Sequence, residues 1–294
     1  MVEYKIGFIG LGMMGSAMVE CLQKKEYSVT VLGNKNRTPI DTAIARGATE
    51  VSTAKELAEC SNVIMLCMGT SDHVEGRMYG DDGVISGLQK DTVVIDFGTS
   101  LPASTKKIGA DVAAQGATYL DAPLGRTPAH AMDGLLNIMC SGNESAFERV
   151  RPLLEDLGEN VFHLGALGTG HSIKLINNFF GMTLVSAMCE AFSMADKVGV
   201  DREQLYSVMS SGPLHSMMMD FVKAYAVDAD LSKLEFSIKN ARKDVNYFKS
   251  MAEEVEFTGM VYPATVKTFD AAAQAGFGES NVPAILDYLQ QLND

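Results

Sequence analysis

An apolar segment near the start of the chain runs directly into three glycines with fixed spacing, and this feature constrains the fold most. Residues 4–9 are rich in aromatic and β-branched side chains, Gly10, Gly12 and Gly15 follow, and a helix-forming stretch begins at Met13. In a strand–turn–helix unit, such glycines permit the turn, let a pyrophosphate approach the backbone, and allow the helix to pack closely on the strand. The pattern predicts a dinucleotide-binding βαβ unit, with the helix N-terminus facing the phosphates. The expected cofactor contacts in this loop are Gly10, Leu11, Gly12, Met13 and Met14.

Short apolar segments alternate with amphipathic stretches as far as about residue 163. Strands are expected at residues 4–9, 28–32, 63–66, 92–95 and 118–120, and helices at 13–24, 55–60 and 104–114. This alternation is typical of a parallel sheet with crossover helices. It predicts an α/β Rossmann-type doubly wound sheet.

The glycine-rich segment at 164–170 interrupts any regular element and predicts a domain boundary. Helical periodicity follows, and no further strand pattern returns. Helices are expected at residues 171–198, 202–210, 233–254, 263–274 and 283–292. We therefore expect a dinucleotide-binding domain at 1–163 and an all-helical (all-α) domain at 164–294, which serves substrate binding and oligomerisation.

Charge and cysteine content restrict the partners and the location. The formal net charge is −13, and the 24 Lys and Arg residues form no block, which argues against nucleic-acid binding. No uninterrupted apolar run of about 18 residues and no signal-peptide pattern is found, so no membrane association is expected. The five cysteines lack metal-ligand spacing and are expected to be reduced thiols of a cytoplasmic protein, with no metal site.

The segment after the second expected strand bears on the choice of cofactor. An Asp or Glu is typical there when NAD is bound, because it accepts the ribose 2′-hydroxyl. Here Asn34 stands without a neighbouring carboxylate, and Lys35 and Arg37 can bind a 2′-phosphate. This favours NADP, while NAD stays open because both cations can be ordinary solvated loop residues.

Three further segments carry a family resemblance. They are Asp-Ala-Pro-Leu-Gly-Arg-Thr-Pro at 121–128, Gly-Thr-Gly-His-Ser-Ile-Lys-Leu-Ile-Asn-Asn at 168–178, and Lys243-Asp244. Together with the glycine loop, and in the same order, they resemble the β-hydroxyacid dehydrogenase family over nearly the whole chain. The family includes 3-hydroxyisobutyrate dehydrogenases and semialdehyde reductases, and the resemblance implies an NAD(P)-dependent enzyme that acts on a small acidic substrate.

The resemblance also implies roles for individual residues. Lys174 corresponds to the family's general acid or base, Asn178 to its substrate-positioning asparagine, and Lys243 to a lysine beside the nicotinamide. Lys174 and Asn178 are four residues apart, so a helix places them on one face. The alternative for Lys174 is a side chain that snorkels from an apolar helix. Met68, Thr99 and Asp244 are further expected cofactor contacts, although Thr99 is equally compatible with a helix N-cap.

The segment after Pro123 departs from the common family pattern of Ser-Gly-Gly. Gly125, Arg126 and Thr127 instead resemble the corresponding segment of the 3-sulfolactaldehyde reductases within this family. A guanidinium presents a rigid fork of donors that suits a sulfonate, carboxylate or phosphate. All three residues are therefore expected to bind the anionic end of the substrate. The alternative is a structural arginine that pairs with an acid such as Asp133.

The expected function is reduction of a short acidic aldehyde with NADPH, or oxidation of the matching hydroxy acid, in a cleft between the two domains. NAD-linked oxidation of a 3-hydroxyisobutyrate-type acid is the alternative reaction. A non-catalytic dinucleotide-binding module also fits the fold, but it has no evident need for Lys174, Asn178 and Lys243. The long apolar helix and the methionine-rich second half predict a homo-oligomer, either a dimer or a tetramer.

Overall fold

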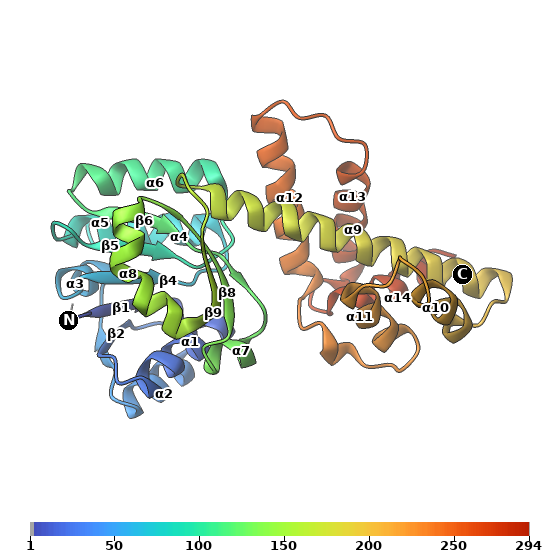
Figure 1. Cartoon of the computed structure of the whole chain (residues 1–294), viewed down its shortest axis with the longest axis horizontal. Helices are drawn as coiled ribbons and strands as arrows, with labels where there is room; N and C mark the ends of the chain where they lie inside the picture. Colours follow the sequence, from blue (N-terminus) through green and yellow to red (C-terminus); the bar gives the residue numbers. More distant parts are fainter. Residues whose placement is uncertain (1–2, 294) are drawn as a thin grey trace. The chain divides into compact units, whose positions relative to one another are not determined.

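The computed structural model describes residues 3–293. The chain forms two compact units, Met1–Lys174 and Leu175–Asp294, which divide within the long helix α9 (Thr169–Val198). The domain boundary expected from the sequence, after residue 163, lies in the loop that precedes this helix. Figure 1 shows a sheet flanked by helices in the first unit and helices alone in the second. The expected fold class is confirmed.

Six parallel strands form the main part of the sheet in the first unit, in the order β3-β2-β1-β4-β5-β6. They are β1 (Ile6–Ile9), β2 (Val29–Leu32), β3 (Thr49–Val51), β4 (Val63–Leu66), β5 (Val93–Asp96) and β6 (Thr118–Asp121). The strand order reverses direction at β1, as in a doubly wound sheet, and the carboxyl ends of the strands therefore open onto a shared edge. Ligands of such sheets bind at that edge.

The sheet continues into an extension that the sequence pattern did not lead us to expect. β8 (Leu136–Gly142) pairs antiparallel with β6 and with β7 (Leu124–Gly125), and parallel with β9 (Gly158–His163). The signal for β8 was present, because Leu136, Ile138 and Cys140 alternate with less buried residues. β3, β7 and β9 are short or largely exposed strands, which weakens any hydrophobic periodicity.

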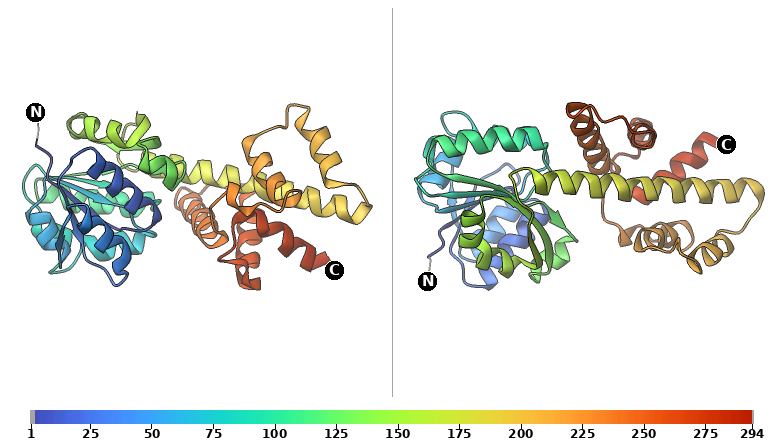
Figure 2. Two further views of the ribbon diagram at one scale, coloured as in Figure 1. Left: turned by 90° about the horizontal axis from the view of Figure 1, so that it is seen from below. Right: turned by 45° about the horizontal axis from the view of Figure 1, so that its top comes forward.

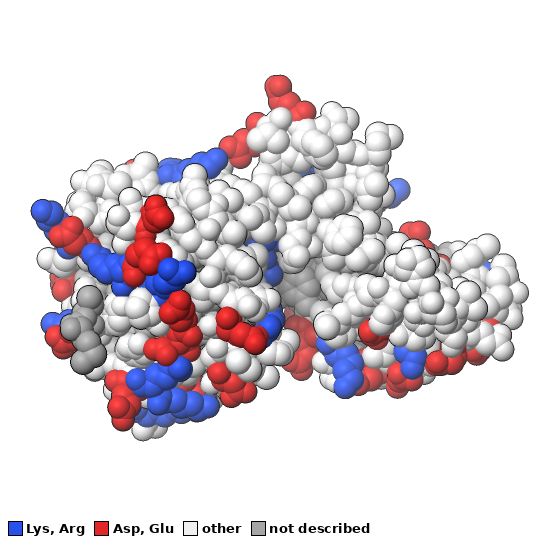
Figure 3. All heavy atoms as spheres, viewed as in Figure 1, with Lys and Arg blue, Asp and Glu red and all other residues white. Residues whose placement is uncertain are grey.

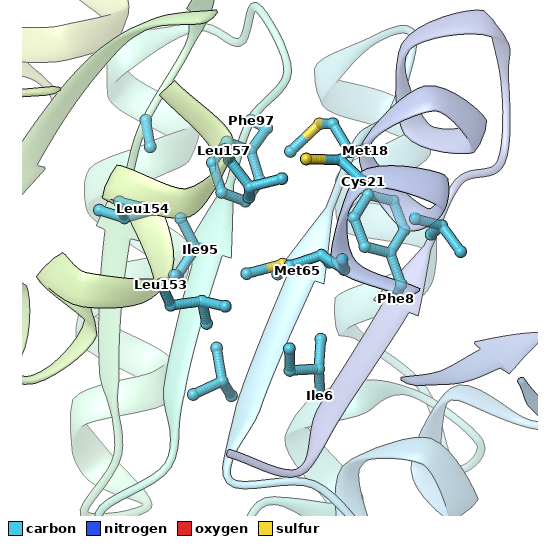
Figure 4. Close-up of a cluster of buried hydrophobic side chains, with 14 of the residues drawn as sticks. Ile6, Phe8, Met18, Cys21, Met65, Ile95, Phe97, Leu153, Leu154 and Leu157 are labelled. Atoms are coloured by element: carbon cyan, nitrogen blue, oxygen red, sulfur yellow. The ribbon is translucent and has the colours of Figure 1, made fainter. Parts of the chain in front are cut away.

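Helices cover both faces of the sheet. Because successive side chains of a strand point to opposite faces, and both faces are buried, the central strands are apolar throughout. The helices are α1 (Met13–Lys24), α2 (Arg37–Ala45), α3 (Ala54–Glu59), α4 (Ser71–Met78), α5 (Val84–Gly87), α6 (Pro102–Ala114), α7 (Pro128–Met132) and α8 (Glu144–Leu157). Ile6 and Phe8 of β1 face a core shared with α1, α2, α7 and α8, whereas Ile9 faces a core shared with α3 to α6. Figure 4 shows the first core, in which Met18 of α1 and Leu157 of α8 lie over the strands. Each fully buried side chain of this size stabilises the fold by about 1.5–3 kcal/mol.

The second unit packs around the part of α9 that begins at Leu175. Its other elements are α10 (Arg202–Ser210), α11 (Met217–Ala226), η1 (Leu231–Lys233), α12 (Ile238–Glu254), α13 (Tyr262–Ala272), the π-helical turn η2 (Ala273–Phe277), η3 (Val282–Ala284) and α14 (Ile285–Asn293). Met182, Val185, Cys189 and Phe192 recur at helical spacing and face the core of this unit. Figure 2 shows the other helices arranged around α9 in two further views. Helix α11 was not expected from the sequence.

Helix α9 is long and apolar enough to cross a membrane by length and composition alone, with a mean hydropathy of 1.2 over the segment that meets this test. In the structure, 44% of that segment is buried inside the protein. Its buried side chains belong to the core of the second unit. Packing within the second unit therefore accounts for part of the apolar character of the helix, and other apolar side chains of α9, among them Phe180 and Met194, are exposed.

Candidate functional site

A pocket of about 260 Å³ lies in the first unit at the carboxyl ends of β1, β2 and β4. The residues that line it come from the loops after these strands and from the helices that follow. They are Ile9, Gly10, Leu11, Gly12, Leu32, Gly33, Asn34, Asn36, Pro39, Ile40, Cys67, Met68, Gly69 and Arg77. Of the expected cofactor contacts in this unit, Gly10, Leu11, Gly12, Asn34 and Met68 line the pocket, whereas Met13, Met14, Lys35, Arg37 and Thr99 are not among its lining residues.

The three glycines of the first loop each meet a different constraint. Gly10 has a φ of +101°, and a Cβ atom there would lie 2.3 Å from the carbonyl oxygen of Cys67. A Cβ atom at Gly15 would lie 2.0 Å from the carbonyl oxygen of Gly10. A Cβ atom at Gly12, by contrast, would have no atom within 4 Å. Gly10 and Gly15 are therefore required by the fold itself, whereas Gly12 leaves open space at the pocket.

The N-terminus of α1 begins beside this open space. Gly12 occupies the N-cap position, where no side chain accepts a hydrogen bond from the helix, and the first turn contains no acidic residue. The first N–H groups of a helix attract phosphate in such a position, because they lack partners within the helix and carry the positive end of its dipole. The residues present thus fit a dinucleotide pyrophosphate.

A carboxylate that the sequence pattern does not reveal lies next to Gly33, which is one of the pocket's lining residues. Glu50 of β3 pairs with Arg37, through N–O distances of 2.5 and 3.0 Å, and its Oε1 lies 2.5 Å from the position of a Cβ atom at Gly33. Arg37 also donates to Asp41 at 2.7 Å. The hydrogen bonds from Arg37 lower the pKa of Glu50, and those to Glu50 and Asp41 raise the pKa of Arg37. Glu50 is 13 residues from Arg37 in the sequence, and the pairing of β2 with β3 is what brings its side chain close to Arg37. The sequence alone could therefore not identify this ion pair.

Arg77 is a second pocket residue that the sequence analysis missed. It lies in the last turn of α4 and lines the same pocket as Gly10 and Asn34. No motif marks it, because its position depends on the crossover from β4 through α4. It adds a cationic side chain to a pocket suited to an anionic ligand.

The Asp121-Ala122-Pro123 motif meets the start of α9 within the first unit. The Asp121 carboxylate accepts the backbone N–H groups of Gly168 and His171, both at 2.8 Å, and the hydroxyl of Ser141 at 2.5 Å. The Ser141 hydroxyl oxygen accepts the N–H of Gly170 at 2.9 Å. Two motifs that are far apart in the sequence are thus joined, and Lys174 follows His171 by less than one helical turn.

The segment that carries Arg126 is held in an unusual backbone conformation. Arg126 has a φ of +77°, which costs a non-glycine residue about 1–3 kcal/mol. Its guanidinium donates to the carbonyl oxygen of Leu135 at 2.7 Å and pairs with Glu159 at 2.5 Å. The acid that pairs with Arg126 is thus Glu159, and not Asp133 as considered above. Thr127 forms a hydrogen bond with the Nδ1 atom of His130 at 2.7 Å.

The predicted polar residues of the second unit form a connected cluster. Asp244, which is 2% exposed, accepts a hydrogen bond from the Asn178 side-chain amide at 2.6 Å and pairs with Lys243 at 3.0 Å. The ammonium of Lys243 also lies 5.4 Å from the ring centre of Tyr247. Asp244 therefore orients both neighbours. Sequence spacing could not reveal this, because 66 residues separate Asn178 from Asp244.

Among the residues that the structure describes, no three His, Cys, Asp or Glu side chains are grouped so that they could hold a metal ion. The polar groups of the described site are instead amide, ammonium, guanidinium and carboxylate groups. They suit binding of anions and transfer of protons.

Comparisons with known proteins identify similar chains and a similar fold. The model for the NAD-binding domain of 6-phosphogluconate dehydrogenase matches residues 5–165, and that for the NAD-binding region of NADP-dependent 3-hydroxyisobutyrate dehydrogenase matches residues 168–289. The chain is 30% identical to 3-sulfolactaldehyde reductase from Escherichia coli K12, over 97% of this chain and 95% of the relative. It is 28% identical to 2-hydroxy-3-oxopropionate reductase from the same organism, over 97% of each. The structure of 3-hydroxyisobutyrate dehydrogenase from Mycobacterium tuberculosis has the same fold, with a TM-score of 0.89, 24% identity, and coverage of 98% of this chain and 100% of that one.

Proposed function

Because the chain belongs to the β-hydroxyacid dehydrogenase family of NAD(P)-dependent oxidoreductases, we propose that it reduces a short acidic aldehyde with NADPH or oxidises the matching hydroxy acid. The observation that carries this proposal is the junction of the Asp121 motif with the first turn of α9. That junction fixes the backbone next to Lys174 in the unit that also contains the dinucleotide pocket. The relatives that reduce 3-sulfolactaldehyde and 2-hydroxy-3-oxopropionate support a substrate of this class.

In the proposed reaction, Lys174 is the proton donor. When bound, the reduced cofactor supplies a hydride to the carbonyl carbon. Lys174 donates a proton to the oxygen on which negative charge develops, and in the reverse direction its neutral amine accepts that proton. Asn178 binds the substrate by hydrogen bonds, and Asp244 holds the Asn178 amide in one orientation.

The proposed activity is testable by absorbance at the nicotinamide band. The purified protein is mixed with NADPH or NADH and, in turn, with succinic, methylmalonic and tartronic semialdehydes, sulfolactaldehyde and glyoxylate. We expect turnover with at least one of these anionic aldehydes and none with an uncharged aldehyde of equal length. Binding of the cofactor without turnover of any substrate would favour the non-catalytic alternative.

We expect NADPH to be preferred, with Arg37 as the contact to the 2′-phosphate. Arg37→Ala should raise the KM for NADPH and leave the KM for NADH nearly unchanged. Glu50→Gln should improve the preference for NADPH by about two- to fivefold, because it removes a carboxylate that competes for Arg37, on the scale of an exposed ion pair. The measurement is kcat/KM with each cofactor at a fixed aldehyde concentration.

One observation favours the NAD-linked alternative. The Glu50 carboxylate lies beside Gly33, the residue that follows β2. NAD-binding proteins of this fold carry an acidic residue at the end of this second strand, where it binds the ribose hydroxyls. If this carboxylate binds the ribose, kcat/KM will be equal or higher with NADH, and Glu50→Gln will impair NADH use. That result would contradict the NADPH assignment.

We expect Arg126 to bind the anionic end of the substrate. Arg126→Lys keeps the charge but loses the two-pronged donor geometry, and it should lower kcat/KM by about tenfold, the scale of a hydrogen bond to a charged group. Glu159→Gln is the matched control, because it removes the ion-pair partner and leaves the guanidinium in place. A purely structural Arg126 would make Glu159→Gln as harmful as Arg126→Lys, whereas substrate recognition predicts little or no loss in the control.

We also propose that the protein is a homo-oligomer assembled through α9. Ile176, Phe180, Met194 and Val198 are exposed apolar residues that form one stripe along this helix, because their spacing repeats its turns. Figure 3 shows that most of the face of the helical unit in that view lacks charged side chains. Sedimentation should give a dimer or tetramer, and Phe180→Glu should shift it toward the monomer. A monomeric wild-type protein at micromolar concentration would refute this assignment.

A cytoplasmic location is proposed as well. The five cysteines, Cys21, Cys60, Cys67, Cys140 and Cys189, are free thiols in the structure. Cysteines that form no disulfide bonds are typical of proteins in reducing compartments. Localisation of a tagged full-length chain by cell fractionation tests this assignment.

A further inference from the structure

We propose that Asp121 and Ser141 are positioning residues that seat the first turn of α9 in the sheet and thereby fix the place of Lys174. This inference rests on the proposed role of Lys174 in proton transfer. It concerns residues of the first unit only, and neither residue was expected to bind substrate or cofactor.

The two side chains accept three backbone N–H groups at the start of α9. Asp121 ends β6 and receives the N–H groups of Gly168 and His171, whereas Ser141 of β8 receives the N–H of Gly170. Ser141 also donates its hydroxyl hydrogen to Asp121, so that each member of the pair fixes the other. The first N–H groups of a helix have no partner within the helix. Here two strands of the sheet supply the partners of Gly170 and His171, whereas Thr169 and Ser172 donate to the carbonyl oxygens of Ala166 and Gly168.

Burial makes this attachment strong and specific. Asp121 and Ser141 are both fully buried, so water cannot replace a hydrogen bond that either of them loses. The backbone approaches so closely that a Cβ atom at Gly170 would lie 2.2 Å from the carbonyl oxygen of Met139. The close contact therefore fixes both the distance of the first turn of α9 from β8 and the direction in which the helix starts.

His171 adds a second attachment on another side of the helix. Its buried ring contacts Thr105 of α6, with the Nδ1 and Oγ1 atoms 2.7 Å apart. The Thr105 hydroxyl also donates to the carbonyl oxygen of Leu101. The sheet and α6 together restrain rotation of α9 about its axis.

The rigidity of the first turn of α9 bears on the position of Lys174, because a movement of one end of a helix moves the residues that follow. Lys174 lies three residues after His171, so a shift or rotation of this turn moves the lysine with it. A misplacement of about 1 Å can cost a reaction about a hundredfold in rate. Loss of the attachment should therefore lower the rate of the chemical step more than the affinity for the cofactor, whose pocket lies at β1, β2 and β4.

The test compares Asp121→Asn and Ser141→Ala with Ser61→Ala in the full-length protein. Asparagine keeps the size of the side chain but places an NH₂ group against one of the present donors. Ser61→Ala is the matched control, because Ser61 is also buried in the first unit and its hydroxyl contacts only its own surroundings at the end of α3, the carbonyl oxygen of Leu57 and, at 3.9 Å, the thiol of Cys60. We measure kcat, KM, the dissociation constant for NADPH, the pH profile of kcat, and hydrogen–deuterium exchange of the peptide that covers residues 168–175.

Asp121→Asn should lower kcat by about thirtyfold and Ser141→Ala by a smaller factor, with less than about a threefold change in NADPH affinity. Hydrogen–deuterium exchange at residues 168–175 should become faster in both variants. The part of the pH profile of kcat that depends on protonation of Lys174 should shift along the pH axis. Ser61→Ala should lower the Tm without any of these effects. The proposal is overturned if kcat and the exchange of this segment stay unchanged, or if NADPH affinity falls as much as kcat.

The exchange measurement separates this proposal from the proposed function. If no aldehyde is turned over by the wild-type protein, the proposed function fails. Faster exchange confined to residues 168–175 in Asp121→Asn would still support the anchor, and unchanged exchange there would refute it.

Discussion

Lys174→Met should lower kcat by at least about a hundredfold while NADPH binding stays intact, because the variant lacks the group that protonates the developing alkoxide. Methionine keeps an unbranched side chain of similar length and a good helix propensity, so α9 should persist. The dinucleotide pocket is built from loops after β1, β2 and β4 and does not include Lys174. The measurements are steady-state kinetics with the best aldehyde, NADPH titration by fluorescence, and the Tm.

Lys197→Met is the matched control for this prediction. Lys197 lies in the last turn of the same helix and donates to the carbonyl oxygen of Asn293, so its loss removes a lysine from α9 outside the proposed site. We expect near wild-type kcat from this variant. A folded Lys174→Met protein that binds NADPH and retains most of its turnover would transfer the role to Lys243.

The parallel sheet could be predicted from the sequence because its strands are buried on both faces. Residues 63–66 form β4 as expected, and the expected strand at 118–120 is one residue shorter than β6. Val63 and Met65 face one core, and Ile64 and Leu66 face the other, which produces a continuous apolar run that is easily found. β3 has the sequence Thr-Glu-Val and is mostly exposed, so no comparable run marks it.

The candidate site could be predicted only where its parts are local in sequence. Gly10, Gly12 and Gly15 lie within six residues. Together they permit the turn after β1, the approach of a pyrophosphate to the backbone and the close packing of α1 on the strand. The partners of Arg37 and Asn178 lie on other elements, at Glu50 and Asp244, and each requires knowledge of tertiary structure. The structural role of Asp121 is not visible in the sequence for the same reason, because its partner Ser141 follows 20 residues later and its partner His171 follows 50 residues later.

Gly12→Val should weaken NADPH binding by about a hundredfold or more and leave the Tm of the cofactor-free protein nearly unchanged. The backbone of Gly12 is extended, with φ −76° and ψ −166°, so valine can adopt it without strain. A Cβ atom there meets no protein atom within 4 Å. The added methyl groups instead occupy the space through which the pyrophosphate approaches the N-terminus of α1. Overpacking costs about 1–3 kcal/mol and occasionally more, and each 1.4 kcal/mol changes the dissociation constant about tenfold.

Two comparisons make the Gly12 result specific. Gly278→Val also adds a side chain in open space, at a helical φ of −54°, and should leave NADPH binding unchanged. Gly15→Val should instead lower the Tm, because its Cβ atom would collide with the carbonyl oxygen of Gly10 before any cofactor arrives. NADPH affinity is measured by fluorescence titration and the Tm by calorimetry without cofactor. If Gly12→Val bound NADPH as tightly as the wild type, the pyrophosphate would have to lie away from this glycine, and the open space beside it would need another occupant.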